Sequence, residues 1–276
     1  MRIERIDSNL HIYGVGRLSL ADTLDCGQAF RWAQNPDGTW QAIVHGRLLK
    51  VGGDGDEFIL YDCDENEYNT VWHDYFDLGR DYEKIITDIS KNDVLRSATE
   101  LCGGIRLLRQ DPWETLCSFI ISQNNNIPRI KGIIDRLCEN FGDKIDGGFA
   151  FPTADKLTGL SVDDLAPLRS GFRAKYILDA AQKVTSGEVD LNSLYSLDTD
   201  TARNELIRIK GVGAKVADCT LLFAFGKIDA FPKDVWIKRA MQVLFDGELP
   251  GEAVKYAGIV QQYIFHYARM TKLKID

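Results

Sequence analysis

The chain has 276 residues, of which 45% are apolar and 27% are charged, and its formal net charge is −8. This is ordinary globular composition, so extensive disorder is excluded. No apolar run reaches the ~18 residues of a membrane span, and the charged start, residues 1–7, lacks the apolar run of a secretory signal. We therefore expect an intracellular protein with no membrane partner.

The charge is unevenly distributed along the chain. Residues 1–100 have a net charge of −9, whereas residues 101–276 have a net charge of +1. A basic face in the second part is therefore compatible with the acidic total. Charge alone neither supports nor excludes a DNA partner.

The cysteines and histidines do not form a recognisable metal motif. No C-x-x-C pair occurs, and the cysteine spacings fit neither a zinc site nor an iron–sulfur cluster. We predict no metal site and free thiols, as in a reducing compartment. The cysteines are Cys26, Cys63, Cys102, Cys117, Cys138 and Cys219, and the histidines are His11, His45, His73 and His266.

The first part of the chain has the pattern of an antiparallel sheet. Residues 40–51 and 58–61 are apolar and partly alternating, and turn-forming residues at 36–39 and 52–56 precede each stretch. Residues 71–100 change to helical spacing. The pattern predicts an N-terminal sheet domain over residues 1–105.

From about residue 106 onward the pattern is helical, so the whole chain is predicted to be α+β with a helical region over residues 106–276. Asp111, Pro112 and Glu114 form a helix-start signal. The expected helices run from there to about Ser122, from about Ile130 to Phe141, from Ser161 for a short distance, from Tyr176 to about Gly187, on both sides of residues 210–213, after Asp234, and from about Glu252 to Met270.

Two of these helices flank the segment Lys210-Gly211-Val212-Gly213. Glycines permit a tight turn that a Cβ would strain. Backbone N–H groups at the following helix start can hold a phosphate, with Lys210 beside them. A plain helix–helix connection explains the glycines equally well.

Lys215 lies near the start of the second of these helices, where the helix dipole disfavours an ammonium group. A neutral amine is a nucleophile that can form a Schiff base. Asp218 and Cys219 follow three and four residues later and share its helix face. The alternative is a solvated surface lysine.

Asp234 precedes an apolar helix in Phe231-Pro232-Lys233-Asp234-Val235-Trp236. An N-cap is sufficient to explain an aspartate there. An ionised carboxylate at a helix N-terminus can also face positive charge that develops in a site.

These features together resemble the helix-hairpin-helix, Gly/Pro/Asp superfamily of DNA glycosylases. Within it the chain is similar to the 8-oxoguanine DNA glycosylase family, in the branch without an iron–sulfur cluster. The resemblance extends over most of the chain. It rests on residues 26–32 (CGQAFRW), 118–120 (SFI) with 124–127 (NNNI), 171–176 (GFRAKY), the hairpin, and the last helix.

The resemblance implies catalytic roles for two residues and one role for a backbone carbonyl. Lys215 would attack C1′ of the damaged nucleotide and form a Schiff base, and Asp234 would stabilise the oxocarbenium-like charge. The carbonyl oxygen of Gly27 would accept the N7–H that 8-oxoguanine has and guanine lacks.

Three further residues would bind the flipped base. Gln261 would contact its Watson–Crick edge, and Cys219 and Phe265 would enclose its ring. Gln261 and Phe265 are spaced i and i+4 on one helix, so both can face one pocket.

The resemblance also implies DNA contacts at the opposite strand. Asn124 would fill the gap left by the flipped base, Arg129 and Arg173 would donate to the opposite cytosine, and Phe172 would act as a wedge. An enzyme acting on a base in a duplex needs such parts. Phe172 replaces the usual tyrosine, Trp236 replaces the usual histidine, and Cys26 is a local variation beside Gly27.

From this resemblance we predict a monomeric, bifunctional glycosylase and AP lyase that excises 8-oxoguanine opposite cytosine from double-stranded DNA without a metal or organic cofactor. We expect it in the cytoplasm or nucleoid of a bacterium or archaeon, or in the nucleus of a eukaryote. One alternative is a hairpin glycosylase for another lesion. An endonuclease III-like enzyme would have a cysteine cluster after the last helix, yet no cysteine follows Cys219. The other alternative is a non-catalytic hairpin module that binds DNA phosphates.

Overall fold

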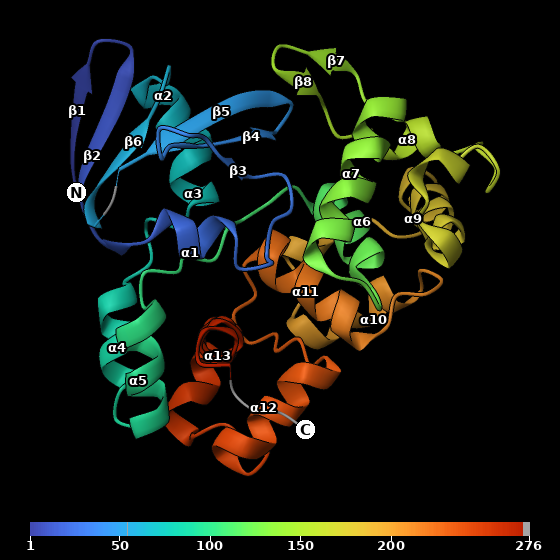
Figure 1. Ribbon diagram of the computed structural model, residues 1–276. Coiled ribbons are helices and arrows are strands. Elements are labelled where there is room, and N and C mark those ends of the chain that lie inside the picture. Colours follow the sequence, from blue (N-terminus) through green and yellow to red (C-terminus); the bar gives the residue numbers. More distant parts are fainter. Residues whose placement is uncertain (54, 273–276) are drawn as a thin grey trace.

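The computed structural model describes residues 1–53 and 55–272 and has the predicted α+β architecture, with an antiparallel sheet at the N-terminal end and helices elsewhere (Figure 1). The strands of the large sheet are ordered β1-β2-β6-β5-β4-β3, and neighbouring strands are antiparallel. They are β1 (Arg2–Ile6), β2 (Asn9–Leu18), β3 (Ala33–Gln34), β4 (Trp40–Val44), β5 (Arg47–Gly52) and β6 (Gly55–Leu60).

Alternating side chains of the central strands form the core of the sheet. Leu10 pairs with Leu60 and Ile12 pairs with Phe58 across β2 and β6, and all four side chains are fully buried. The ring of Phe58 packs edge-on against Phe76, with centroids 4.7 Å apart. The two-residue period of the strands thus places one face of the sheet against the helical segment that follows it.

The apolar stretch 40–51 is a hairpin of β4 and β5. Its turn is formed by His45 and Gly46, whose φ angles are +49° and +75°. Two successive left-handed residues match the twist of a two-residue hairpin. Histidine is an unusual residue for such a turn, and the alternation of apolar residues does not indicate the break.

The helices occupy most of the chain after residue 64. They are α1 (Leu20–Leu24), α2 (Glu65–Glu67), a π-helical segment (Tyr68–Trp72), α3 (His73–Tyr75), α4 (Tyr82–Ile89), α5 (Asp93–Cys102), α6 (Pro112–Ser122), α7 (Ile127–Phe141), α8 (Ala154–Leu157), α9 (Ala174–Thr185), α10 (Thr199–Ile207), α11 (Ala214–Phe225), α12 (Val235–Phe245) and α13 (Ala257–Met270). Short 3-10 segments lie at Ala166–Leu168, Gly171–Arg173, Ser193–Tyr195 and Gly251–Tyr256, and a small hairpin is formed by β7 (Lys144–Ile145) and β8 (Gly148–Phe149). Within residues 1–53 and 55–272, no helix is long and apolar enough to cross a membrane.

Two helix predictions are wrong in detail. No α-helix starts at Ser161, because Ser161 and Asp164 hydrogen-bond to each other's backbone in a turn and Pro167 has no N–H to continue a helix. The last α-helix begins at Ala257, after a 3-10 segment that starts at Gly251. The predicted start signals at Asp111 and Asp234 are confirmed, since both side chains cap the helices that follow.

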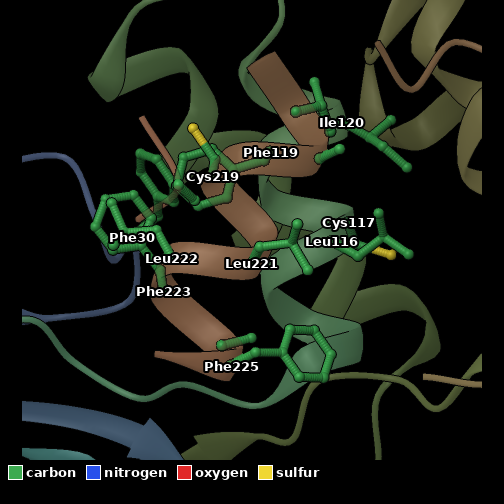
Figure 2. Close-up of a cluster of buried hydrophobic side chains, with 14 of the residues drawn as sticks. Phe30, Leu116, Cys117, Phe119, Ile120, Cys219, Leu221, Leu222, Phe223 and Phe225 are labelled. Atoms are coloured by element: carbon green, nitrogen blue, oxygen red, sulfur yellow. The ribbon is translucent and has the colours of Figure 1, made fainter. Parts of the chain in front are cut away.

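The buried apolar side chains form two clusters. One lies under the sheet, and the other joins the helices of the second part of the chain. Helices α4 and α5 belong to the second cluster because α5 packs along α13. The boundary near residue 105 stays a prediction. The helical cluster is centred on α6 and α11, whose facing side chains are drawn in Figure 2.

Candidate active site

The hairpin between α10 and α11 has a backbone that only glycine can form at one position. Gly211 has a φ of +82°, and a Cβ there would lie 2.4 Å from the ring of Tyr176. The backbone N–H of Lys210 donates to Asp179 Oδ2 at 2.6 Å. The turn is therefore fixed against α9 on one side while the Lys210 side chain remains exposed.

Gly213 is the N-cap of α11, and no side chain caps the helix there. A Cβ at Gly213 would meet nothing within 4 Å. The first N–H groups of α11 thus lack a side-chain acceptor. The space beside Gly213 is open. Helix N-termini of this kind bind phosphate groups.

Lys215 lies in the first turn of α11, with Nζ 3.4 Å from Ser122 Oγ and 5.1 Å from the centre of the Phe119 ring. Cys219 lies one turn further and is buried, and burial raises the pKa of its thiol to about 11. Asp218 turns away and pairs with Arg203 of α10. Of the two residues predicted to share the lysine's face, Cys219 alone lies with it in the pocket.

Asp234 caps α12 by accepting the Ile237 N–H at 2.6 Å, and it also lies in the pocket wall. The two possibilities left open by the sequence are therefore compatible in one side chain. Trp236, two residues later, packs edge-on against Phe265 with ring centroids 5.2 Å apart. Trp236, which stands where the family usually has a histidine, thus contacts Phe265 of the pocket.

Helix α13 contributes a column of side chains to the same pocket. Gln261, Phe265 and Arg269 are spaced four residues apart and all line it. Gln261 is only 5% exposed, and its Oε1 accepts a hydrogen bond from Gln262 Nε2 at 2.7 Å. The i and i+4 spacing predicted to bring Gln261 and Phe265 together does so.

Gly27 also lines the pocket, with a φ of +88° that favours glycine. A Cβ there would point to Ile127 and Phe265, at 3.5 and 3.8 Å. Its neighbour Gln28 is buried and holds the loop, because its side chain donates to two backbone carbonyls and accepts the Leu108 N–H. The backbone of Gly27 is therefore held at the pocket surface.

The pocket has a volume of about 460 Å³, within the usual range of ligand sites, about 300–1,000 Å³. It contains all six residues predicted to act on or bind the base: Gly27, Lys215, Cys219, Asp234, Gln261 and Phe265. Sequence reasoning did not identify several other lining residues, among them Cys26, Phe30, Phe119, Ser122, Gln262 and Arg269. Figure 2 shows Phe119 of α6 beside Cys219 of α11, with Phe223 and Phe30 further along the same cluster.

The residues predicted to contact the opposite strand lie outside the pocket lining. Asn124 is exposed in the loop before α7 with a φ of +47°, and Arg129 is exposed at the start of α7. Phe172 is 47% exposed, although it is apolar. Arg173 is buried and donates to the carbonyls of Gln123 and Asn124, so it holds this loop in place.

Cations near the pocket have no carboxylate partner. In the part of the chain that the structure describes, Arg129, Lys210, Lys215, Lys233 and Arg269 form no ion pair. Many basic residues elsewhere are paired, as in Lys50 with Asp37. These five cations are therefore not neutralised by ion pairs within the protein, despite the net charge of −8. The described residues contain no group of three or more His, Cys, Asp or Glu side chains that could hold a metal ion.

Comparisons with known proteins identify the family of the chain. Residues 12–116 match the model for the N-terminal domain of 8-oxoguanine DNA glycosylase, and residues 117–249 match that of the HhH-GPD superfamily of base excision DNA repair proteins. The N-glycosylase/DNA lyase of Saccharomyces cerevisiae is 34% identical over 257 residues, which cover 80% of this chain and 67% of that protein.

Two solved structures are similar over nearly the full length. The 8-oxoguanine glycosylase/lyase of Clostridium acetobutylicum, bound to double-stranded DNA with cytosine opposite 8-oxoG, is 37% identical with a TM-score of 0.92, covering 99% of each chain. MBOgg1, bound to a low-affinity DNA ligand, is 40% identical with a TM-score of 0.92, covering 98% of this chain and 99% of that one. The chain belongs to the 8-oxoguanine DNA glycosylase family.

Proposed function

We propose that the chain is a bifunctional DNA glycosylase and AP lyase that excises 8-oxoguanine from duplex DNA and then cleaves the strand. The observation that supports this most strongly is that the amine of Lys215 and the carboxylate of Asp234 line one pocket. Its volume of about 460 Å³ is large enough for a flipped base. The Clostridium relative is named as a glycosylase/lyase and was bound to DNA with cytosine opposite 8-oxoG. We assign the same duplex to this chain as its substrate.

Lys215 is the nucleophile in this proposal. Its Nζ attacks C1′ while the bond from C1′ to N9 breaks, and the departing base takes a proton that the nitrogen releases as it bonds to C1′. The nitrogen then forms an imine with C1′ as the bond from C1′ to O4′ opens, and O4′ becomes a hydroxyl. Loss of a C2′ proton and cleavage of the bond from C3′ to oxygen complete the β-elimination.

Asp234 stabilises the positive charge that develops on the sugar during this step. Its carboxylate lies in the pocket wall at the N-terminus of α12, where it accepts a hydrogen bond from the Ile237 N–H. A fixed negative charge facing a developing cation lowers the barrier without rearrangement of solvent.

The base is held by the remaining pocket residues. The Gly27 carbonyl accepts the N7–H of 8-oxoguanine, whereas guanine presents an acceptor lone pair at N7. Gln261 contacts the Watson–Crick edge, and Cys219 and Phe265 enclose the ring. Burial of Gln261 makes an unmatched base edge costly, because its amide groups then remain without partners.

The duplex is held by the rim around this pocket. The first N–H groups of α11 and the Lys210 side chain bind backbone phosphates. Asn124 and Phe172 fill the space that the flipped base leaves, and Arg129 and Arg173 contact the opposite cytosine. Arg173 has to release part of its present hydrogen bonding to the 123–124 loop to reach that base.

Lys215→Gln tests the role of the nucleophile. With a duplex containing 8-oxoguanine opposite cytosine, we expect excision to fall by about 10³-fold or more and strand cleavage to be lost. Binding to the lesion duplex should change little. Lys91→Gln is the matched control, because Lys91 is an exposed lysine that does not line the pocket.

The assay measures base release and strand cleavage separately in single-turnover reactions. Base release by Lys215→Gln at the wild-type rate would assign the nucleophile to another group. A wild-type chain that binds the duplex but releases no base would favour a non-catalytic hairpin module.

A further inference from the structure

Gln262 is a buried polar residue that the proposed mechanism does not use. It is 4% exposed, lies beside Gln261 on α13, and lines the same pocket. Its Nε2 donates to Gln261 Oε1 at 2.7 Å, so the two side-chain amides are directly coupled. Buried amides rarely lack such partners, because an unsatisfied group costs free energy.

Cys26 holds the other end of the Gln262 amide. Its Sγ lies 3.4 Å from Gln262 Oε1 and 3.4 Å from the Thr23 carbonyl oxygen. Burial raises the pKa of this thiol to about 12, so it stays protonated at neutral pH and can donate its one hydrogen either to Gln262 Oε1 or to the Thr23 carbonyl oxygen. A donor at this end favours the Gln262 oxygen facing it, which leaves the Gln262 nitrogen facing Gln261.

This arrangement determines which groups Gln261 can present to a base. Its Oε1 uses one lone pair for Gln262 and retains another, while both of its Nε2 hydrogens stay available. The Watson–Crick edge of a guanine-type base has a donor at N1 and an acceptor at O6. An adenine-type base has the reverse, an acceptor at N1 and a donor at N6.

We propose that Gln262, held by Cys26, is a positioning residue that fixes the Gln261 amide so that it matches a guanine-type edge and not an adenine-type edge. The inference rests on the proposed function and deepens it. Without Gln262, the Gln261 amide can turn over and satisfy either edge. Gln262 thus contributes to base selectivity through Gln261, without contacting the base itself.

The test compares excision of 8-oxoguanine and 8-oxoadenine, each opposite cytosine, in single-turnover reactions. Gln262→Leu removes the donor while keeping a side chain of similar bulk. We expect the ratio of the 8-oxoguanine rate to the 8-oxoadenine rate to fall about tenfold relative to wild type, as for the loss of one buried hydrogen bond. Gln182→Leu, at an exposed glutamine of α9, is the matched control.

Two outcomes would overturn this assignment. One is that both excision rates and their ratio stay at wild-type values, and the other is an equal slowing of both substrates at an unchanged ratio, which would indicate altered packing alone. Gln262→Met, which keeps the unbranched shape, gives the same test if Gln262→Leu does not fold. Absence of 8-oxoguanine excision by the wild-type chain would instead overturn the proposed function itself.

Cys26 variants test whether the thiol of Cys26 holds the Gln262 amide in its orientation. Cys26→Ser keeps a hydrogen donor and should lie closer to wild type in this ratio than Cys26→Ala. Equal ratios for the two variants would contradict the part assigned to Cys26.

Discussion

The pocket and its rim differ in how their side chains are held. In the pocket, Lys215, Asp234 and Gln261 project from helices α11 to α13 or their caps, and each has a partner within the protein. At the rim, Asn124 and Phe172 are exposed, and Asn124 has a left-handed backbone. The side chains proposed to act in catalysis are therefore held by contacts within the protein, whereas those proposed to meet the duplex are exposed on a loop whose backbone Arg173 holds.

Arg173 lies at the border between these two regions. It is buried like a pocket residue, and its donors are occupied by carbonyls of the loop that contains Asn124. A protein that must remove a base from a stack benefits from this division, because positioning of the reacting groups and distortion of the duplex are separate tasks. Changes in the pocket should therefore impair chemistry, and changes at the rim should impair base flipping.

After Lys215→Gln, the largest expected effect within this comparison is that of Asp234→Asn. The substitution keeps a side-chain oxygen for the cap on α12 but removes the charge. We expect excision to fall about 10²–10³-fold with little change in melting temperature. Asp234→Ala should in addition lose about 1 kcal/mol of folding stability through the cap.

Single-turnover kinetics and thermal melts measure these two effects separately. Normal excision by Asp234→Asn would limit Asp234 to a capping role, which is the simpler of the two sequence interpretations.

Phe172→Ala is expected to have a smaller effect that depends on the duplex. Because Phe172 is 47% exposed, the free energy of unfolding should change by only about 0.5 kcal/mol. Excision from a fully paired duplex should fall about tenfold, since a wedge lowers the cost of unstacking, which is a few kcal/mol. Excision of 8-oxoguanine from a site without an opposite base should fall less.

The measurement is the ratio of excision rates on the two DNAs. An equal loss on both would contradict a wedge and would place Phe172 in general DNA binding.

The smallest expected effect concerns stability and lies away from both regions. Glu114 of α6 is paired with Arg31 at 3.5 Å, and burial raises the pKa of its carboxyl from 4.5 to about 7. The folded state therefore favours the protonated acid more than the unfolded state does. The free energy of unfolding should fall as pH rises from about 4.5 through 7, by on the order of 1 kcal/mol.

Glu114→Gln should remove this slope, and Glu248→Gln, at an exposed glutamate, should leave it intact. Denaturant unfolding at a series of pH values provides the comparison. A wild-type slope retained in Glu114→Gln would assign the titration to another group.

Local signals in the sequence predicted the helix starts well. Asp111 and Asp234 cap the helices expected after them, because a cap depends on residues three positions apart. The hairpin turn at His45 and Gly46 was not evident, since it depends on strand pairing and not on residue preference. At Ser161 the start signal exists, but Pro167 prevents the helix.

The same distinction holds for the site. Gln261 and Phe265 could be paired from their spacing on one helix. Ser122, Phe119 and Gln262 could not be identified, because they join the pocket only when α6, α11 and α13 pack together. The coupling of Cys26 to Gln262 spans 236 residues, and no local pattern indicates it.

The central claim is that Lys215 forms a covalent bond with the lesion nucleotide. The most direct test is to add borohydride to the wild-type chain with an 8-oxoguanine:cytosine duplex and to identify the modified peptide by mass spectrometry. We predict a lesion-dependent adduct on the peptide that contains Lys215, and none with a guanine:cytosine duplex. An adduct on another residue, or base release without any adduct, would contradict the account.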